Sequence, residues 1–468
     1  MHPHPTDGAS RPSSPSFWLR VREYAVPAAM IETATVRRHA GDWAGACAAA
    51  GVDVDLDPRT VARVHGRERA ALIRADLRAL APDLLRWHLP RIAPDGLLRP
   101  GLTLALARYD AAPDRARPLY LVARTPPAWA DAGQRIALGL WDGTDTEPAP
   151  RHHPHPHPHP RYRLDLHRHL WDASRSAELR TRSGTASPAG GAEPPPRAVD
   201  RWAAEARILL RAEGLPDGPV VVRLDSRRRL LLDAFGRGDA STGPPVPRTT
   251  PLAPRDPTPG LPVLPEAAVR VPPDAELLRA GLIGPDRLHP LVAAALVPGH
   301  VPAGPPVTPH AAGAPRFVDC RGERHRIGLR DGVLVPFDHD PGELLREELL
   351  VALTGTPLPC LRAIDEAHRR PDCLAGVRER LDHGDVSGAL AVVEGLLGPD
   401  AVLRGGALRE ELETAARRRI DHGLYRAGLA GPGPGPGPGP RPGPEPVRSR
   451  AAARSTLHRE RPRRATHR

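Results

Sequence analysis

The spacing of apolar residues changes along this chain from a helical pattern to a strand-like one and back. Between residues 60 and 87, apolar side chains recur mostly three or four positions apart, as on one face of a helix. Pro90 stops this pattern, because proline lacks an amide hydrogen and clashes with the preceding turn. Together with the alanine-rich stretch 37–50, the spacing predicts a helical region over residues 30–95.

Strand-like segments follow this helical region. Apolar residues alternate or dominate in residues 102–106, 119–123, 136–140 and 162–166. Period-two alternation is typical of antiparallel strands with one face toward solvent, so we expect His167 and His169, on the polar side of the last segment, at the surface. With a helix over 199–212 and a hairpin over 220–232, these strands indicate a β-rich α+β domain over residues 96–235.

A second hairpin and several helices are predicted in the C-terminal part. Asp331-Gly332 lies between two alternating apolar segments, which is the strongest short hairpin signal in the chain. Asp340 then precedes a proline and a glutamate at the positions that favour a helix start. Further helices are expected near 358–369, 373–382, 386–397 and 407–427. Residues 263–430 therefore indicate a hairpin plus helical C-terminal domain.

The expected fold class is α+β, an antiparallel sheet region flanked by helical N-terminal and C-terminal regions. Segments rich in Pro, Gly, Ser or His interrupt it, and we expect them to be disordered. They are an N-terminal extension 1–29, a His-Pro loop insert 145–160, a polar insert 183–197, a linker 236–262 and a Gly-Pro and Arg-rich tail 431–468. Regular patterning begins near Met30, so both Met1 and Met30 are candidate start residues.

Composition excludes several function classes. The chain contains no lysine, which P-loop nucleotide hydrolysis, typical protein kinases and pyridoxal enzymes require. The sequence Asp365-Glu366-Ala367-His368 spells a helicase signature, but its Walker A lysine is missing, so we interpret it as part of an amphipathic helix. No apolar run is long enough to span a bilayer, no secretory signal is recognisable, and the four cysteines are scattered. These features predict a soluble cytoplasmic protein without membrane contact or cofactor.

The net charge of +11 is concentrated at the C-terminus. Residues 441–468 hold nine arginines and two glutamates, a net charge of +7, and residues 1–29 add +1. About +3 remains for the roughly 410 residues between them. Binding of nucleic acid is therefore possible through the basic tail, whereas the body of the chain is nearly neutral.

Two groups of side chains are candidates for metal or proton chemistry. Asp338 and His339, next to Asp340 and near Asp319, Cys320 and His325 in sequence, combine carboxylates with imidazole, as metal-dependent hydrolases do. The His-Pro run supplies five imidazoles that a transition metal accepts, and His167 and His169 could join them. Those five are His152, His153, His155, His157 and His159. Alternating proline favours an extended chain that separates these rings, so a solvated loop is the simpler interpretation.

One internal echo favours protein binding. Gly41-Asp42-Trp43-Ala44-Gly45-Ala46 matches Gly384-Asp385-Val386-Ser387-Gly388-Ala389, and each precedes or opens an apolar helix. Both segments resemble the turn of tetratricopeptide-type helical hairpins over about a dozen residues, without the 34-residue period. The resemblance implies protein–protein contacts; ordinary helix packing is the alternative.

A second segment favours DNA binding. Ala62, Gly66 and Leu72 lie near the positions where a helix-turn-helix has a small residue, a turn glycine and a core residue, which would place the motif in residues 58–88. Two packed helices or one bent helix would give the same pattern. Our first expectation is a non-enzymatic accessory or scaffold protein with a protein partner. The alternatives are a DNA-binding protein using residues 58–88 and the tail, and a metal-dependent hydrolase around residues 338–340.

Overall fold

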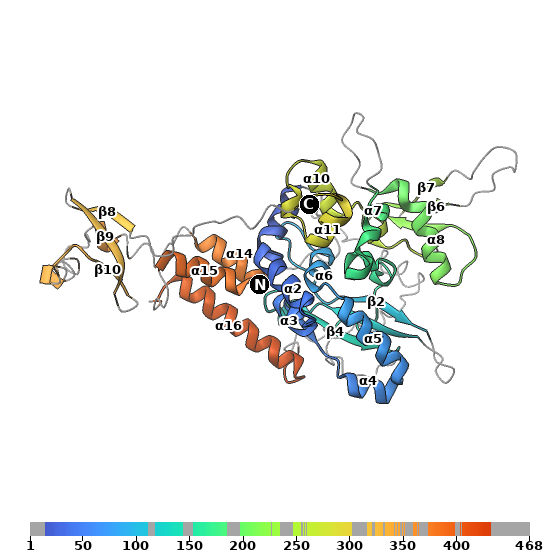
Figure 1. Cartoon of the computed structure of the whole chain (residues 1–468), viewed down its shortest axis with the longest axis horizontal. Helices are drawn as coiled ribbons and strands as arrows, with labels where there is room; N and C mark the ends of the chain where they lie inside the picture. The colour runs from blue at the N-terminus through green and yellow to red at the C-terminus, as the bar shows by residue number, and fades with distance from the viewer. Residues whose placement is uncertain are drawn as a thin grey trace, which may run out of the picture.

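The computed structural model describes residues 15–110, 118–143, 153–184, 197–225, 227–234, 247–253, 256, 258, 260–301, 316–320, 323–330, 333–340, 342–343, 345–346, 349, 351, 359–362, 364, 373–397, 403 and 405–431. The fold is α+β, as expected (Figure 1). His152, the helicase-like segment 365–368, the polar insert apart from its ends, and the tail after Gly431 lie outside the described residues.

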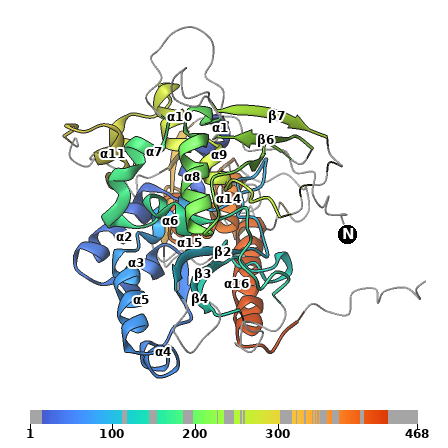
Figure 2. The same cartoon turned by 90° about the vertical axis from the view of Figure 1, so that its right-hand side faces the viewer.

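Five helices occupy the region where helical spacing predicts them. They are α2 (Ala28–His39), α3 (Trp43–Ala49), α4 (Pro58–His65), α5 (Arg67–Ala79) and α6 (Pro82–His88). Gly66 separates α4 from α5 with a positive φ of 88°, and Pro82 begins α6. Residues 58–88 therefore form three helices, not one bent helix or two packed helices. In both views α4 and α5 project from the rest of the molecule (Figures 1 and 2).

The prediction of a disordered extension over 1–29 is wrong for its last fifteen residues. Helix α1 (Pro15–Arg20) and the π-helical turn η1 (Val21–Ala25) precede α2. Phe17 and Val21 are buried in the main core, although Pro and Ser dominate the sequence before them. A short helix with two or three apolar contacts is too brief to show a clear hydrophobic period.

The central sheet has the strand order β1-β4-β3-β2. The strands β2 (Thr103–Tyr109), β3 (Leu119–Arg124) and β4 (Ile136–Trp141) are antiparallel and coincide with predicted segments. The short β1 (Val52–Val54), which runs parallel to β4, was not predicted because it is only three residues long.

The predicted strand over 162–166 is wrong. A single bridge joins Arg163 to Ala105, and two 3-10 turns follow, η3 (Leu164–Leu166) and η4 (Arg168–Leu170). Three apolar residues over five positions are too few to distinguish a strand from consecutive short 3-10 turns, which are common as connectors. The chain continues through η5 (Ala173–Glu178) and α7 (Leu179–Arg182).

A second sheet packs with α8 and its neighbours. After η6 (Val199–Arg201) and α8 (Trp202–Ala212), strands β5 (Val220–Arg223), β6 (Arg229–Asp233) and β7 (Arg248–Leu252) form an antiparallel sheet in that order. The assignment of residues 236–262 as a disordered linker is therefore wrong for β7. That strand is at the sheet edge with mostly exposed side chains, so it pairs through its backbone and lacks an apolar pattern.

Short helices connect this sheet to the C-terminal part. They are α9 (Glu266–Val269), α10 (Pro273–Arg279), η7 (Pro285–Arg287) and α11 (Pro290–Leu296). The predicted hairpin is confirmed as β9 (Glu323–Arg330) paired with β10 (Val333–Pro336), and β8 (Arg316–Cys320) adds a third strand. Helices α14 (Leu374–Asp382), α15 (Val386–Leu397) and α16 (Ala407–Arg426) lie where the sequence predicts them.

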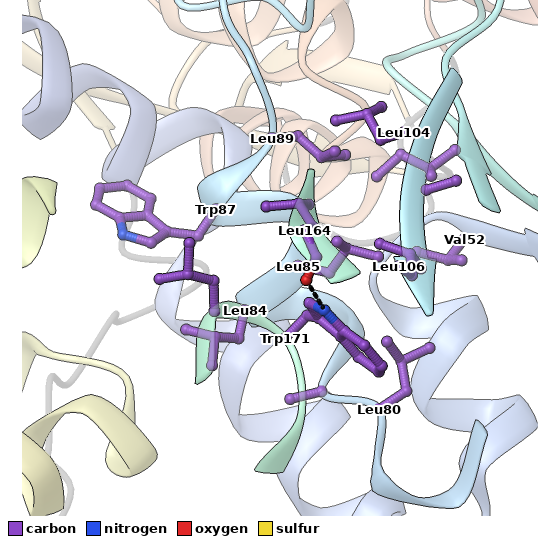
Figure 3. Packing of buried hydrophobic residues seen from close by; sticks show 14 of the residues in the cluster. Val52, Leu80, Leu84, Leu85, Trp87, Leu89, Leu104, Leu106, Leu164 and Trp171 are labelled. Atoms are coloured by element: carbon purple, nitrogen blue, oxygen red, sulfur yellow. Dashed lines mark hydrogen bonds between the residues drawn. The ribbon is translucent and has the colours of Figure 1, made fainter. Parts of the chain in front are cut away.

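The largest core joins the N-terminal helices to the central sheet (Figure 3). Leucines of α6 and β2 interlock there with Trp87 and Trp171, and the Trp171 indole donates to the Leu164 carbonyl at 3.0 Å. Separate smaller cores lie under α8 and between α14, α15 and α16. The N-terminal helices therefore share the main core with the central sheet, whereas α14, α15 and α16 have a core of their own.

Candidate functional site

The candidate hydrolase residues Asp338 and His339 each contact a different neighbouring side chain. Asp338 accepts hydrogen bonds from the side chain and the backbone amide of Arg326, and these bonds lower the pKa of Asp338 to about 2. A carboxylate with so low a pKa is a poor general base near neutral pH. The ring of His339 stacks on His325 with centroids 4.1 Å apart, which directs the two imidazoles alongside one another rather than toward a common ion.

The described part of the His-Pro run is a strap along the edge strand β2. The His159 amide donates to the Thr103 carbonyl at 2.8 Å, and the Thr103 hydroxyl donates to the His155 carbonyl at 2.7 Å. Pro154 lies so close to Gly101 that a Cβ on this glycine would be 2.6 Å from the proline ring. An extended Pro-rich segment has no internal hydrogen bonds, so its backbone groups are free to pair with β2. Residues 153–160 are thus ordered, contrary to the expectation of a disordered loop.

The imidazoles of this strap do not converge. His153 is buried, and its two ring nitrogens contact the Thr125 carbonyl and the His155 amide. The ring of His157 packs against Trp141. Within the described ranges, no group of three or more His, Cys, Asp or Glu side chains is arranged to hold a metal ion.

His167 and His169 are buried, so the expectation that they lie at the surface is wrong. His167 donates to the Arg163 carbonyl from Nδ1, and its Nε2 lies 3.3 Å from Glu205. Burial opposes the charge of Glu205, but hydrogen bonds from His167 and Arg182 outweigh it and lower the Glu205 pKa to about 2. Burial also holds the pKa of His169 well below its usual range. The 3-10 turns bring both rings inward.

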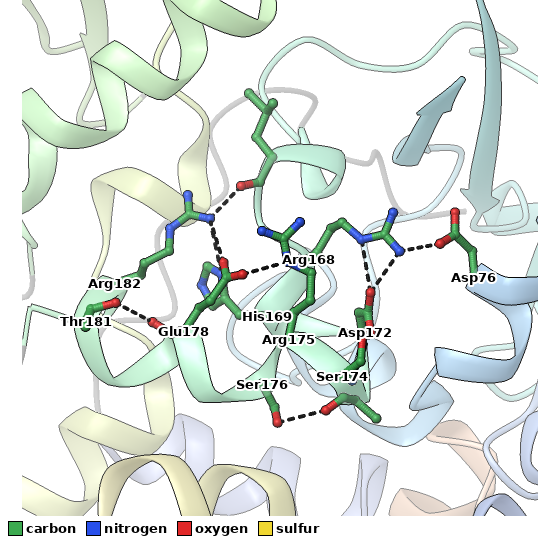
Figure 4. A network of polar contacts seen from close by, with 12 residues as sticks. Asp76, Arg168, His169, Asp172, Ser174, Arg175, Ser176, Glu178, Thr181 and Arg182 are labelled. Atoms are coloured by element: carbon green, nitrogen blue, oxygen red, sulfur yellow. Dashed lines mark hydrogen bonds and ion pairs between the residues drawn. The ribbon is translucent and has the colours of Figure 1, made fainter. Parts of the chain in front are cut away.

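Around these histidines, η4, η5 and α7 carry a network of ion pairs (Figure 4). Arg168 binds Asp76 of α5 and Asp172. Arg182 forms an ion pair with Glu205 of α8. Each acid in this network is matched by an arginine, and the contacts connect α5 and α8 through the intervening turns. We interpret the network as structural.

The helix-turn-helix interpretation of residues 58–88 is wrong in its core. Leu72 is 55% exposed, whereas the motif requires it inside. The exposed face of α5 instead presents Arg67, Arg74 and Arg78 at helical spacing, and none of the three has an ion pair within the described ranges. The helix pair therefore carries a basic surface without the geometry of the DNA-binding motif.

The two echo sequences form the same structure. In helical hairpin A (α2–α3), Asp42 caps α3 by accepting from the Gly45 amide at 2.8 Å, and Arg37 donates to the same carboxylate at 2.9 Å. In helical hairpin B (α14–α15), Asp385 accepts from the Gly388 amide at 2.9 Å and from Arg380 at 2.7 Å.

The shared pattern is therefore longer than the echo read from the sequence. An arginine five residues before the aspartate extends it. The glycine that begins each segment, Gly41 or Gly384, has a positive φ. The second glycine, three residues after the aspartate, leaves room for the carboxylate, because a Cβ at Gly45 or Gly388 would be 2.1 Å from its oxygen. The arginine five residues before each aspartate is visible in the sequence, so a longer comparison of the two segments could have found it.

The two hairpins are joined by the buried side chain of Arg86, which is 1% exposed. Its guanidinium donates to the carbonyls of Ala25, Ala50 and Gln134, and to that of His383 at the end of α14 at 2.5 Å. None of these partners is a carboxylate. Burial lowers the pKa of Arg86 to about 10, so the side chain remains charged at neutral pH.

A cleft of about 470 Å³ lies between the hairpins. Its walls come from α2, α3, the loop before β4, the α14–α15 turn and the middle of α16. Gly133 and Gly384 meet at its base, where a Cβ on Gly384 would be 2.0 Å from the Gly133 carbonyl oxygen. Four arginines and one aspartate line it, namely Arg86, Arg135, Arg418, Arg419 and Asp385. We refer to this feature as the interhairpin cleft; its volume is in the range of small-molecule and cofactor pockets, about 300–1,000 Å³.

Comparisons with known proteins identify no relative of this chain. No protein-family model matches the chain, and no curated protein and no solved structure matches it. Among the helices that the structure describes, none has the length and apolar character needed to cross a bilayer.

Proposed function

We propose that this chain is a protein-binding accessory protein that holds a segment of its partner in the interhairpin cleft. The observation that supports the proposal is the framing of one cleft by two helical hairpins with the same capped turn. Paired helical hairpins present a concave surface between their helices, which extended or helical peptide segments fill in many binding proteins. The junction is held by Arg86 from below, so the cleft is preorganised and little conformational entropy is lost on binding.

Site-specific photo-cross-linking tests this proposal. A photoreactive amino acid replaces Thr33, which lines the cleft from α2, and the matched control carries it at Val36, which is 68% exposed on the same helix but outside the cleft. In cells that express the full chain naturally, we expect one cross-linked partner from position 33 and none from position 36. Equal cross-linking at both positions, or none at position 33, contradicts the proposal.

A second candidate function is binding of a nucleic-acid backbone by α4 and α5. It is favoured by one observation, the exposed arginine stripe on the projecting helix α5. Phosphate contacts make affinity depend on salt, with a slope of about 0.9 per phosphate in a double-logarithmic plot. Replacing both Arg74 and Arg78 by glutamine should lower that slope by about 1 to 2. Replacing Arg211 and Arg223, which are exposed on other elements, should leave it unchanged; an equal effect of the two pairs contradicts this candidate.

A further inference from the structure

The interhairpin cleft has an excess of positive charge that its own residues do not neutralise. Arg86 at its base donates only to carbonyl oxygens, and the neighbouring buried Arg91 donates to the carbonyls of Gly96 and Arg86. Both guanidinium groups are buried, and neither has a carboxylate as hydrogen-bond partner within the described ranges. A buried charge of this kind is costly, and a nearby anion offsets part of that cost.

The other basic residues of the cleft differ in how far they are already engaged. Arg135 binds Asp53, and Arg418 donates to Asp382 at 2.6 Å. Arg419 lies one residue further along α16 and is exposed, with no hydrogen bond or ion pair to any residue of the described ranges. It is therefore the side chain that can engage a ligand without breaking an existing contact.

The single acid of the cleft does not cancel this charge. The Asp385 carboxylate is 7% exposed and already accepts hydrogen bonds from Arg380 and the Gly388 amide. Its negative charge is directed toward these donors. An arriving carboxylate would therefore meet guanidinium groups on α16 and at the base, with Asp385 already paired.

We propose that the interhairpin cleft recognises an acidic segment of the partner, with Arg419 as the side chain that binds its carboxylates directly. This inference rests on the proposed protein-binding function and adds the chemistry of the ligand. Charge complementarity selects an acidic peptide over an apolar one, because an apolar occupant would leave the guanidinium groups desolvated and unpaired. Arg86 acts on the ligand over a longer range, since its hydrogen-bond donors are occupied by backbone carbonyls.

A binding assay with defined peptides tests the ligand chemistry. The full chain is titrated into a fluorescently labelled peptide of ten glutamates, and in parallel into the isosteric peptide of ten glutamines. We expect the glutamate peptide to bind at least tenfold more tightly. The variant Arg419→Gln should weaken binding of the glutamate peptide about fivefold, as expected for an accessible ion pair.

The control variant is Arg417→Gln, which removes the same charge from the same helix. Arg417 is exposed and does not line the cleft, so we expect its replacement to weaken binding less than twofold. Both arginines are exposed, so both variants should keep the melting temperature of the unmodified chain. Equal weakening by the two variants, or equal affinity for the two peptides, overturns the inference.

Location is established by a photoreactive residue in the glutamate peptide. Cross-links to residues 29–33, 384–387 or 415–419 support the inference, whereas cross-links confined to residues 432–468 assign the binding to the arginine-rich tail and overturn it. Loss of the cross-links to the cleft residues when a single-stranded oligonucleotide is added before irradiation would overturn it in favour of nucleic acid. Sequencing of the partner segment captured at position 33 separates the two proposals: a neutral or basic segment overturns the acidic ligand and leaves protein binding standing.

Discussion

Replacing Arg86 by methionine removes the contact that joins the two helical hairpins. Methionine fills a similar volume with an unbranched chain but donates no hydrogen bond, so four carbonyl acceptors of different segments lose their partner. Each buried acceptor left without a donor costs about 1–3 kcal/mol. The variant also avoids burying a guanidinium, which offsets part of this loss. We expect a net loss of about 3–5 kcal/mol, because the cost of four unpaired acceptors exceeds the gain from no longer burying the charge.

Differential scanning calorimetry measures the expected change. A loss of this size lowers the melting temperature by roughly 6–20 °C, at about 2–4 °C per kcal/mol for domains of 150–250 residues. Hydrogen exchange should at the same time increase in α14, whose last turn contacts Arg86 through the His383 carbonyl. The control is Arg59→Met, at an exposed position where substitutions usually change stability by less than about 0.5 kcal/mol. A change in melting temperature no larger than that of the control would refute the reasoning.

Three further predictions concern the cleft and the strap. Replacing Asp385 by alanine should cost about 1–2 kcal/mol in urea unfolding, because the α15 cap and the bond to Arg380 are both lost; an unchanged midpoint would contradict the capping role. Gly384→Ala should destabilise by more than about 2 kcal/mol, since φ is +84° and the Gly133 carbonyl blocks a Cβ, whereas Gly376→Ala within α14 should stabilise by about 0.5–1 kcal/mol. The two glycine substitutions must change the free energy of unfolding in opposite directions. Burial lowers the His153 pKa from 6.5 to about 4, so the unfolded chain takes up this proton first and stability should fall as pH decreases from 6.5 toward 4. His153→Gln should reduce the decrease in melting temperature between pH 7.5 and 5, and an unaltered decrease would count against this assignment.

The elements that could be predicted from the sequence are those whose signal is local and repeated. The hairpin of β9 and β10 follows from one turn dipeptide between alternating residues, and α15 and α16 follow from long helical patterns. The elements that were missed are held by few contacts or by backbone pairing alone. Helix α1 is six residues long, and β7 needs no apolar side chain because it pairs only at one edge.

The candidate site could be predicted only in part, for a different physical reason. The repeated turn at Asp42 and Asp385 is visible in the sequence, since capping depends on residues within five positions of one another. Arg86 gives no such signal, because its partners are backbone carbonyls of distant segments and any residue type supplies a carbonyl. Asp338 and His339 were singled out by residue type alone. Residue type does not indicate that hydrogen bonds from Arg326 lower the pKa of the Asp338 carboxylate.

The contact between Arg86 and His383 also sets an order of events during synthesis. The two residues are 297 positions apart, so a ribosome adding about 5–20 residues per second emits the second roughly 15–60 s after the first. For that time the N-terminal helices can collapse around a guanidinium that lacks one of its acceptors. The position that the His383 carbonyl occupies beside Arg86 remains open until α14 has been synthesised. A nascent chain that ends before α14 therefore has only one side of the interhairpin cleft, with Arg86 and Arg135 present and the α16 arginines still to be added.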